Sequence, residues 1–154
     1  MSWVVVRVRG EIHAKREIAA TLRFLHLTRA NHATVIPEEP SFRGMLMRVQ
    51  GYVTWGEAEE ATVARLISAR GKSPDGKALG PADGAGAAAA PTPEVAALAK
   101  TVLENGLPAS GALRPLFRLK APTGGWRSTK KPFALGGALG YRGRAINDLV
   151  QRML

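Results

Sequence analysis

Two spacings of apolar residues alternate along the first 70 residues, and they predict strands and helices in turn. Residues 3–9 read WVVVRVR, which places Val4, Val6 and Val8 on one side of an extended chain. The other side carries Val5, Arg7 and Arg9. A period of two with charges on one side is typical of a strand that has one buried and one solvated face.

A helix is predicted after this strand, followed by a second strand, a second helix and a third strand. Ile18, Leu22 and Leu25 recur at i, i+4 and i+7, and this helical pattern fades near residue 27. The apolar run at residues 33–37 predicts the second strand, and residues 52–55 predict the third. Between them an apolar stripe predicts a helix from residue 42 onward, and its members are Phe42, Met45, Leu46 and Val49.

The residues at the predicted helix ends refine this pattern. Ser41 is the expected N-cap of the second helix, because its hydroxyl can accept a hydrogen bond from a free amide of the first turn. Gly44 and Gly51 weaken the helical pattern and leave a strand across residues 45–49 as the alternative. Thr54 and Glu57 have the spacing of a capping box, which would open a third helix over residues 58–70.

The order strand, helix, strand, helix, strand predicts an α/β (α+β) fold for a core domain at residues 1–70. Short connections favour a split β-α-β arrangement, with a three-stranded sheet and both helices on one face. Residues 71–92 read GKSPDGKALGPADGAGAAAAPT. They offer little to bury, and we expect a flexible linker or a loop draped over the surface.

Residues 93–154 form a predicted C-terminal extension. Pro93 follows Thr92, a good N-cap, and begins a short helix that stops at Asn105 and Gly106. Residues 113–119 alternate as a strand does, although Pro115 confines that strand to a sheet edge. Residues 145–154 predict a last amphipathic helix that docks on the core through Ile146, Leu149, Val150 and Met153.

Charge is distributed unevenly along the chain. The formal net charge is +10, and residues 105–154 contain nine Lys/Arg and one acidic residue. Such an excess indicates a polyanionic partner. It is concentrated in residues 120–144, the basic arm, which has six Lys/Arg, six Gly and no acidic residue.

The basic arm also contains three aromatic residues, Trp126, Phe133 and Tyr141. Cations attract phosphate, glycines let the backbone follow a groove, and aromatic rings can stack on unpaired bases. We therefore expect the arm to lie against nucleic acid without a core of its own. The alternative is a mobile tail whose aromatic residues fold back onto the domain.

The sequence contains no constellation typical of an enzyme, a metal site or a cofactor site. Cysteine is absent, which excludes thiolate zinc sites and cysteine nucleophiles. The three histidines, His13, His26 and His32, are scattered, and no P-loop is present. No apolar run approaches the roughly 20 residues of a membrane span, and the N-terminus does not resemble a signal peptide. We expect a soluble, cytoplasmic, non-catalytic protein without cofactor.

Several motifs in order resemble the large-subunit ribosomal protein thirty family in its longer archaeal form. The core resembles it through VRVRGEI, TLRFL, Asn31-His32 leading into ATVIP, and FRGML; the extension does so through RPLFRLKAPTGGW, KKP and LGGALG. The resemblance implies a split β-α-β, ferredoxin-like core and no catalysis. It also implies a place in the large ribosomal subunit, with ribosomal RNA and neighbouring ribosomal proteins as partners and no self-association.

The resemblance also implies which residues contact RNA. In the core the candidates are Arg9, His13, Lys15, Asn31, His32 and Arg43. In the extension they are Arg118, Lys120, Arg127, Lys130 and Lys131. Charge alone adds Arg142 and Arg144.

Two other classes of function stay open at this point. A small ferredoxin-like enzyme could bind a phosphate or acyl-phosphate substrate through Arg9 or Arg43, and it would need a pocket with a polarised group. A basic nucleoid or chromatin protein would bind duplex DNA as well as it binds RNA.

Overall fold

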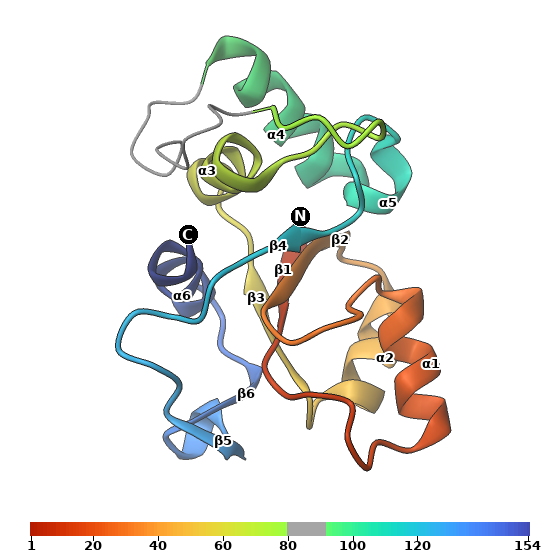
Figure 1. Cartoon of the computed structure of the whole chain (residues 1–154), viewed down its shortest axis with the longest axis vertical. Coiled ribbons are helices and arrows are strands. Elements are labelled where there is room, and N and C mark those ends of the chain that lie inside the picture. The colour runs from red at the N-terminus through yellow and green to blue at the C-terminus, as the bar shows by residue number, and fades with distance from the viewer. Residues whose placement is uncertain (80–91) are drawn as a thin grey trace.

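The computed structural model describes residues 1–79 and 92–154, and it combines helices with a six-stranded sheet (Figure 1). The strands are β1 (Ser2–Arg7), β2 (His32–Pro37), β3 (Val53–Glu57), β4 (Phe117–Arg118), β5 (Ser128–Pro132) and β6 (Gly137–Tyr141). The helices are α1 (Arg16–Phe24), α2 (Pro40–Val49), α3 (Glu60–Arg70), α4 (Pro93–Asn105), α5 (Leu107–Ser110) and α6 (Ala145–Met153), with a 3-10 turn η2 (Phe133–Leu135). The predicted α/β class is confirmed.

The first five elements follow the predicted order, and the sheet is larger than predicted. Its strand order is β4-β2-β1-β3-β6-β5, with β1 antiparallel to both β2 and β3. The C-terminal extension adds strands on both sides. β4 pairs with the start of β2, and β6 runs parallel to β3.

Helices cover both faces of the sheet, so the predicted solvated face of β1 is wrong. Val5 packs beneath α1 and α2 with Leu22, Leu46 and Val49. Even Arg7 is only 1% exposed. The prediction failed because helices from residues 60–153, far from β1 in sequence, cover the Val4 and Val6 face, so α1 and α2 cover the opposite, Val5 face.

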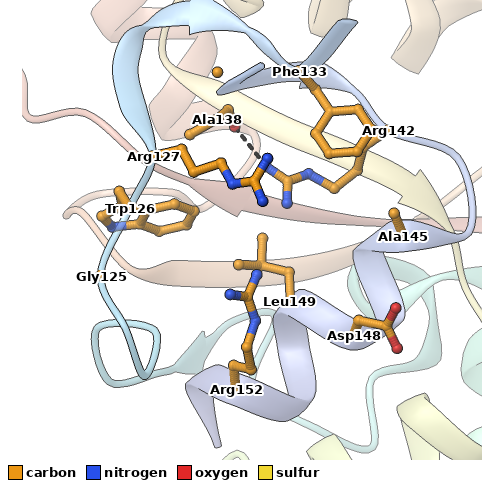
Figure 2. Close-up of a pocket in the computed structure, with 11 residues that line it drawn as sticks. Gly125, Trp126, Arg127, Phe133, Ala138, Arg142, Ala145, Asp148, Leu149 and Arg152 are labelled. Carbon is orange, nitrogen blue, oxygen red and sulfur yellow. Dashed lines mark hydrogen bonds between the residues drawn. The ribbon is translucent and has the colours of Figure 1, made fainter.

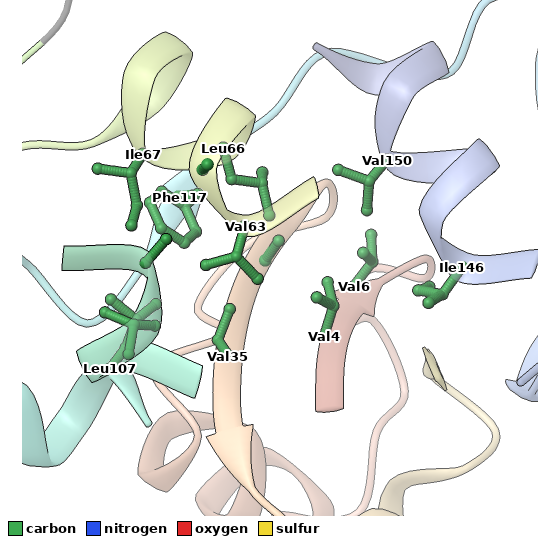
Figure 3. Packing of buried hydrophobic residues seen from close by; sticks show 14 of the residues in the cluster. Val4, Val6, Val35, Val63, Leu66, Ile67, Leu107, Phe117, Ile146 and Val150 are labelled. Carbon is green, nitrogen blue, oxygen red and sulfur yellow. The ribbon is translucent and has the colours of Figure 1, made fainter. Parts of the chain in front are cut away.

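The second face holds the larger core (Figure 3). Val4 and Val6 of β1 and Val35 of β2 pack against side chains of α3, α4, α5 and α6. The last helix docks as expected, through Ile146, Leu149, Val150 and Met153, each at most 1% exposed. Figure 1 shows α1 and α2 on the opposite side of the central strands from α6.

Two predicted helix caps are wrong. The α2 helix begins at Pro40 with Glu39 in the N-cap position, and no side chain caps it. Thr54 and Glu57 lie in β3, so they do not form a capping box. The amide of Glu59, at the start of α3, donates instead to Oδ1 of Asn147 in α6 (3.2 Å). A cap supplied 88 residues away leaves no local signal in the sequence.

The C-terminal boundaries largely match their predictions. α4 begins at Pro93 and ends at Asn105, and β4 is an edge strand, although it is shorter than residues 113–119. Residues 71–79 of the expected linker contain an antiparallel bridge between Lys72 and Ala78, and the amide of Arg114 donates to the Lys72 carbonyl (2.9 Å). The remainder of that linker, residues 80–91, lies outside the described residues.

The basic arm is part of the fold, which corrects the expectation that it lacks packing of its own. It forms β5, η2 and β6. Ala138 and Leu139 of β6 are buried with Val8, and Trp126 packs against them. The alternative in which the aromatic residues fold back onto the domain was therefore closer, since Tyr141 also lies against Trp55 with ring centroids 6.4 Å apart.

Gly56 makes this arrangement possible. A Cβ atom on Gly56 would overlap the carbonyl oxygen of Gly143 and lie 2.9 Å from Cβ of Ile146. The turn between β6 and α6 therefore rests directly on the backbone of β3. Only glycine permits such a close approach.

We expect Gly56→Ala to lower the free energy of unfolding by about 1–3 kcal/mol, because the added methyl group overpacks this contact. Gly44→Ala is the matched control. Gly44 lies in α2 with open space around it, so alanine should raise stability by up to about 1 kcal/mol. Urea unfolding of both variants measures the effect, and equal stabilities would contradict the role of Gly56.

Candidate nucleic-acid interface

The strand register gathers many of the predicted RNA contacts at one end of the sheet. β1 ends where β2 and β3 begin, because both are antiparallel to it, and β6 and β5 run parallel to β3. We call this the basic end. The predicted contacts that lie there, in or beside the strand termini and the loop after β1, are Arg9, His13, Lys15, Asn31, His32, Arg118 and Arg127.

His32 is the centre of a cationic cluster at the basic end. It is the first residue of β2, pairs with Arg118 of β4 and is 8% exposed. Burial lowers the pKa of His32, and the charges of Arg118, Arg29 and Arg7 lower it further. Its Nδ1 lies 3.2 Å from the hydroxyl of Thr28. The imidazole therefore stays neutral in the fold, and the neighbouring arginines supply the positive charge.

Arg7 fixes the loop that carries this cluster. Its Nε donates to the Arg9 carbonyl (2.8 Å) and its Nη1 to the Leu27 carbonyl (2.7 Å). The amide of Asn31 donates to the Arg7 carbonyl (2.8 Å), and Asn31 has a φ of 63°. Asparagine tolerates this left-handed conformation better than most residues. Arg7 therefore has a structural role, and Asn31 shapes the start of β2.

Three other predicted contacts at the basic end, Arg9, His13 and Lys15, are exposed. The Arg9 guanidinium lies over the Tyr52 ring, 5.3 Å from its centroid. His13 and Lys15 are exposed in the loop before α1, where His13 has a φ of 61°. These side chains can contact a polyanion that approaches from solvent.

The basic arm presents a second group of cations along β5, the outermost strand of the sheet. Arg127, Lys130 and Lys131 are exposed there. Lys120 is also exposed, and its amide donates to the Met153 carbonyl at the end of α6 (3.0 Å). The arm is thus anchored by its backbone, while the side chains of Lys120, Lys130 and Lys131 are exposed to solvent.

Acidic residues collect at the opposite end of the sheet, which we call the acidic end. Glu38 and Glu39 directly follow β2, Glu57 ends β3, and Glu59 and Glu60 follow it. Two predicted RNA contacts lie at this end. Arg43 is exposed on α2 and lines a cavity with Glu38 and Glu57, and Arg144 forms an ion pair with Glu57 (Nε to Oε2, 3.7 Å).

Arg142 lies inside the protein, unlike the other arginine and lysine candidates. It is 9% exposed, and its Nε donates to the Thr54 hydroxyl (2.8 Å). Its Nη2 donates to the Ala138 carbonyl (2.8 Å), as Figure 2 shows. Its guanidinium also lies over the Phe133 ring, 4.8 Å from the centroid. Charge alone suggested an exposed contact, whereas the structure uses Arg142 to join β6 to β3.

Arg29 and Arg152 were missed by sequence reasoning. Arg29 belongs to the cluster around His32, and Arg152 influences Arg142 electrostatically. Arg29 lies two residues before Asn31, so its position in the same loop was an available signal. Arg152 gave none, because its proximity to Arg142 depends on how α6 packs.

The part of the chain that the structure describes offers neither a metal site nor a membrane span. Residues 1–79 and 92–154 contain no group of three or more His, Asp or Glu that could hold a metal ion. Among the same residues, no helix combines the length and apolar character needed to cross a membrane.

Comparison with known proteins finds relatives that are similar over nearly the whole chain. Residues 3–53 match the family model described as ribosomal protein L30p/L7e. The chain is 44% identical to the large ribosomal subunit protein uL30 of Methanosphaera stadtmanae, over 99% of each chain. The protein of that name from Methanopyrus kandleri is 42% identical over 96% of this chain and 100% of its own, and that from Ignicoccus hospitalis is 39% identical over 99% and 97%. These matches include the basic arm.

Stability should fall on acidification because of His32. Its pKa in the fold is below 6.5, so the unfolded chain binds the proton first as the pH decreases, and stability is lost from about pH 6.5 downward. Unfolding midpoints at pH 7.5 and 5.5 measure this loss. It should be smaller in His32→Gln and unchanged in the exposed control His13→Gln; equal losses in both variants would refute the assignment.

Proposed function

Because the chain belongs to the L30p/L7e family of ribosomal proteins, we propose that it binds ribosomal RNA of the large subunit through the basic end of its sheet and the exposed edge of β5. It is a ribosomal protein and not an enzyme, so a catalytic role for Arg9 or Arg43 has no support. The RNA contacts are our inference from the distribution of charge.

The separation of charge along the sheet carries this proposal. Three ion pairs join described residues, namely Arg23 with Glu11, Lys100 with Glu60, and Arg144 with Glu57. The predicted contacts at the basic end and on β5 take part in none of these. Exposed cations outside these ion pairs, on a fixed scaffold, favour phosphate binding. They can neutralise phosphates and release counterions from the RNA, and no ion pair within the protein has to break first.

The residue types at the basic end and on β5 suit a phosphate backbone. Arg9 and Arg118 can donate paired hydrogen bonds to phosphate oxygens, and Lys15, Lys130 and Lys131 can act as point charges. Neutral His32, held beside Arg118, would position that arginine. Such contacts fix the protein on its RNA and are largely independent of base identity.

The charge of the acidic end suits a protein partner better than RNA. Glu38, Glu39 and Glu57 would repel a phosphate backbone, so we infer that this end faces away from the RNA and toward neighbouring ribosomal proteins. On this view Arg43 and Arg144 contribute little to RNA affinity, although the sequence alone placed them among the contacts.

We expect affinity for large-subunit rRNA fragments to depend strongly on salt. If six or more phosphates are neutralised, affinity should fall by about 10³-fold or more between 50 and 200 mM salt. Gel-shift or filter-binding titrations measure this slope, with duplex DNA as competitor. A flat salt response would contradict the proposal, and equal affinity for duplex DNA would favour a nucleoid or chromatin protein instead.

Charge-matched variants can distinguish the exposed edge of β5 from the acidic end of the sheet. Lys130→Gln with Lys131→Gln should weaken rRNA binding and reduce the salt slope by about one for each phosphate that is no longer neutralised. Arg43→Gln with Arg144→Gln removes the same charge at the acidic end and should change binding little. Melting curves confirm that both variants fold. An equal loss of affinity in both pairs would mean that general charge, and not the exposed edge of β5, determines binding.

A further inference from the structure

A pocket lies between the basic arm and one face of α6 (Figure 2). Ala145, Asp148, Leu149 and Arg152 line it from α6, at the i, i+3, i+4 and i+7 spacing of a single helical face. Trp126 and Arg127 line it from the arm. Its volume is about 250 Å³, below the roughly 300–1,000 Å³ of sites for drug-sized ligands, so it suits a small group.

Backbone contacts hold the two walls of this pocket together. The amide and the hydroxyl of Thr123 both donate to the Arg152 carbonyl (3.0 and 3.2 Å). Farther along α6, the Met153 carbonyl accepts from the amide of Lys120. The arm therefore approaches α6 at a fixed position, and Trp126 and Arg127 follow directly from it.

Three arginines and one aspartate line the pocket. Arg142 is more than nine-tenths buried, and its hydrogen bonds to Thr54 and Ala138 fix its guanidinium in place. Burial and the charge of Arg152 lower the pKa of Arg142 to about 10, so it remains charged at neutral pH. Figure 2 shows Arg127 and Arg152 directed toward it. Among the described residues, no ion pair joins Asp148 to these arginines.

The positive charges of the three arginines repel one another, and a bound anion would reduce this repulsion. Guanidinium groups bind the planar pairs of oxygens that phosphate and carboxylate present. A phosphate can accept from several arginines at once, and the indole ring of Trp126 beside it offers a stacking surface to a base on the same strand. The combination of converging arginines with an aromatic wall favours a phosphate over a protein carboxylate.

We propose that this pocket binds a phosphate group, held by Arg127 and Arg152 against the fixed guanidinium of Arg142. The group can be a phosphodiester of an RNA strand or free phosphate. The first source rests on the proposed function, whereas affinity for inorganic phosphate does not. Asp148 limits the affinity, and Asp148→Asn should increase it.

Titrations of the ¹⁵N-labelled full-length protein test the proposal, followed through the Nε–H signals of Arg142 and the Trp126 indole. Inorganic phosphate should shift both signals more than chloride does at equal ionic strength. Arg127→Gln with Arg152→Gln should weaken phosphate binding about tenfold or more. Arg65→Gln, an exposed substitution on α3, should leave it unchanged. Equal effects of chloride, or wild-type binding by the double variant, would overturn the proposal.

A single-stranded RNA hexanucleotide distinguishes the two sources. A larger Trp126 shift with RNA than with phosphate supports an RNA phosphodiester with a stacked base, and a response to phosphate alone supports free phosphate. The rRNA gel shift is measured in parallel. Salt-sensitive rRNA binding without any pocket response would overturn this inference and leave the proposed function intact. A pocket response to phosphate without rRNA binding would support the phosphate pocket and contradict the proposed function.

Discussion

The close approach of the β6–α6 turn to β3 is the contact on which the rest of the structure depends. Gly56 has no side chain, so the backbone at Gly143 and the side chain of Ile146 can rest on the strand. Around it, the Thr54 hydroxyl donates to the Gly140 carbonyl (2.8 Å) and accepts from Arg142, while Asn147 donates to the Glu57 carbonyl (3.1 Å). Because buried polar groups must find partners, these bonds fix β6 and α6 in a single position.

This contact turns a glycine-rich, cationic segment into folded structure. Residues 120–144 could not bury enough apolar surface alone, but the edge of β3 offers unpaired backbone groups and Val8 offers an apolar surface. Once β6 has added to the sheet, β5 adds to β6, and its lysines are carried on a strand whose position is set. Cations held in this way lose less conformational entropy on binding RNA than those of a mobile tail would.

The direction of the strands gives the molecule its electrical polarity. Arg9, Asn31 and Arg118 lie at one end of the sheet because β1 and β4 end where β2 begins, while Glu38 and Glu57 lie at the other end because β2 and β3 end together. A protein with a net charge of +10 therefore still has one end rich in acids. This arrangement orients the chain between a phosphate backbone and other surfaces, since the two ends attract opposite partners.

The sequence by itself determined the order of the first five elements, the apolar faces of α2 and α6, the edge position of β4 and the excess of charge, because each depends on spacing or composition within a few residues. It did not reveal the second covered face of β1, the cap that Asn147 gives to α3, the burial of Arg142 or the grouping of Arg127 with Arg152. Those features depend on contacts between residues distant in the sequence. Only the tertiary structure decided them, because strand register and the fit at Gly56 select which distant residues meet.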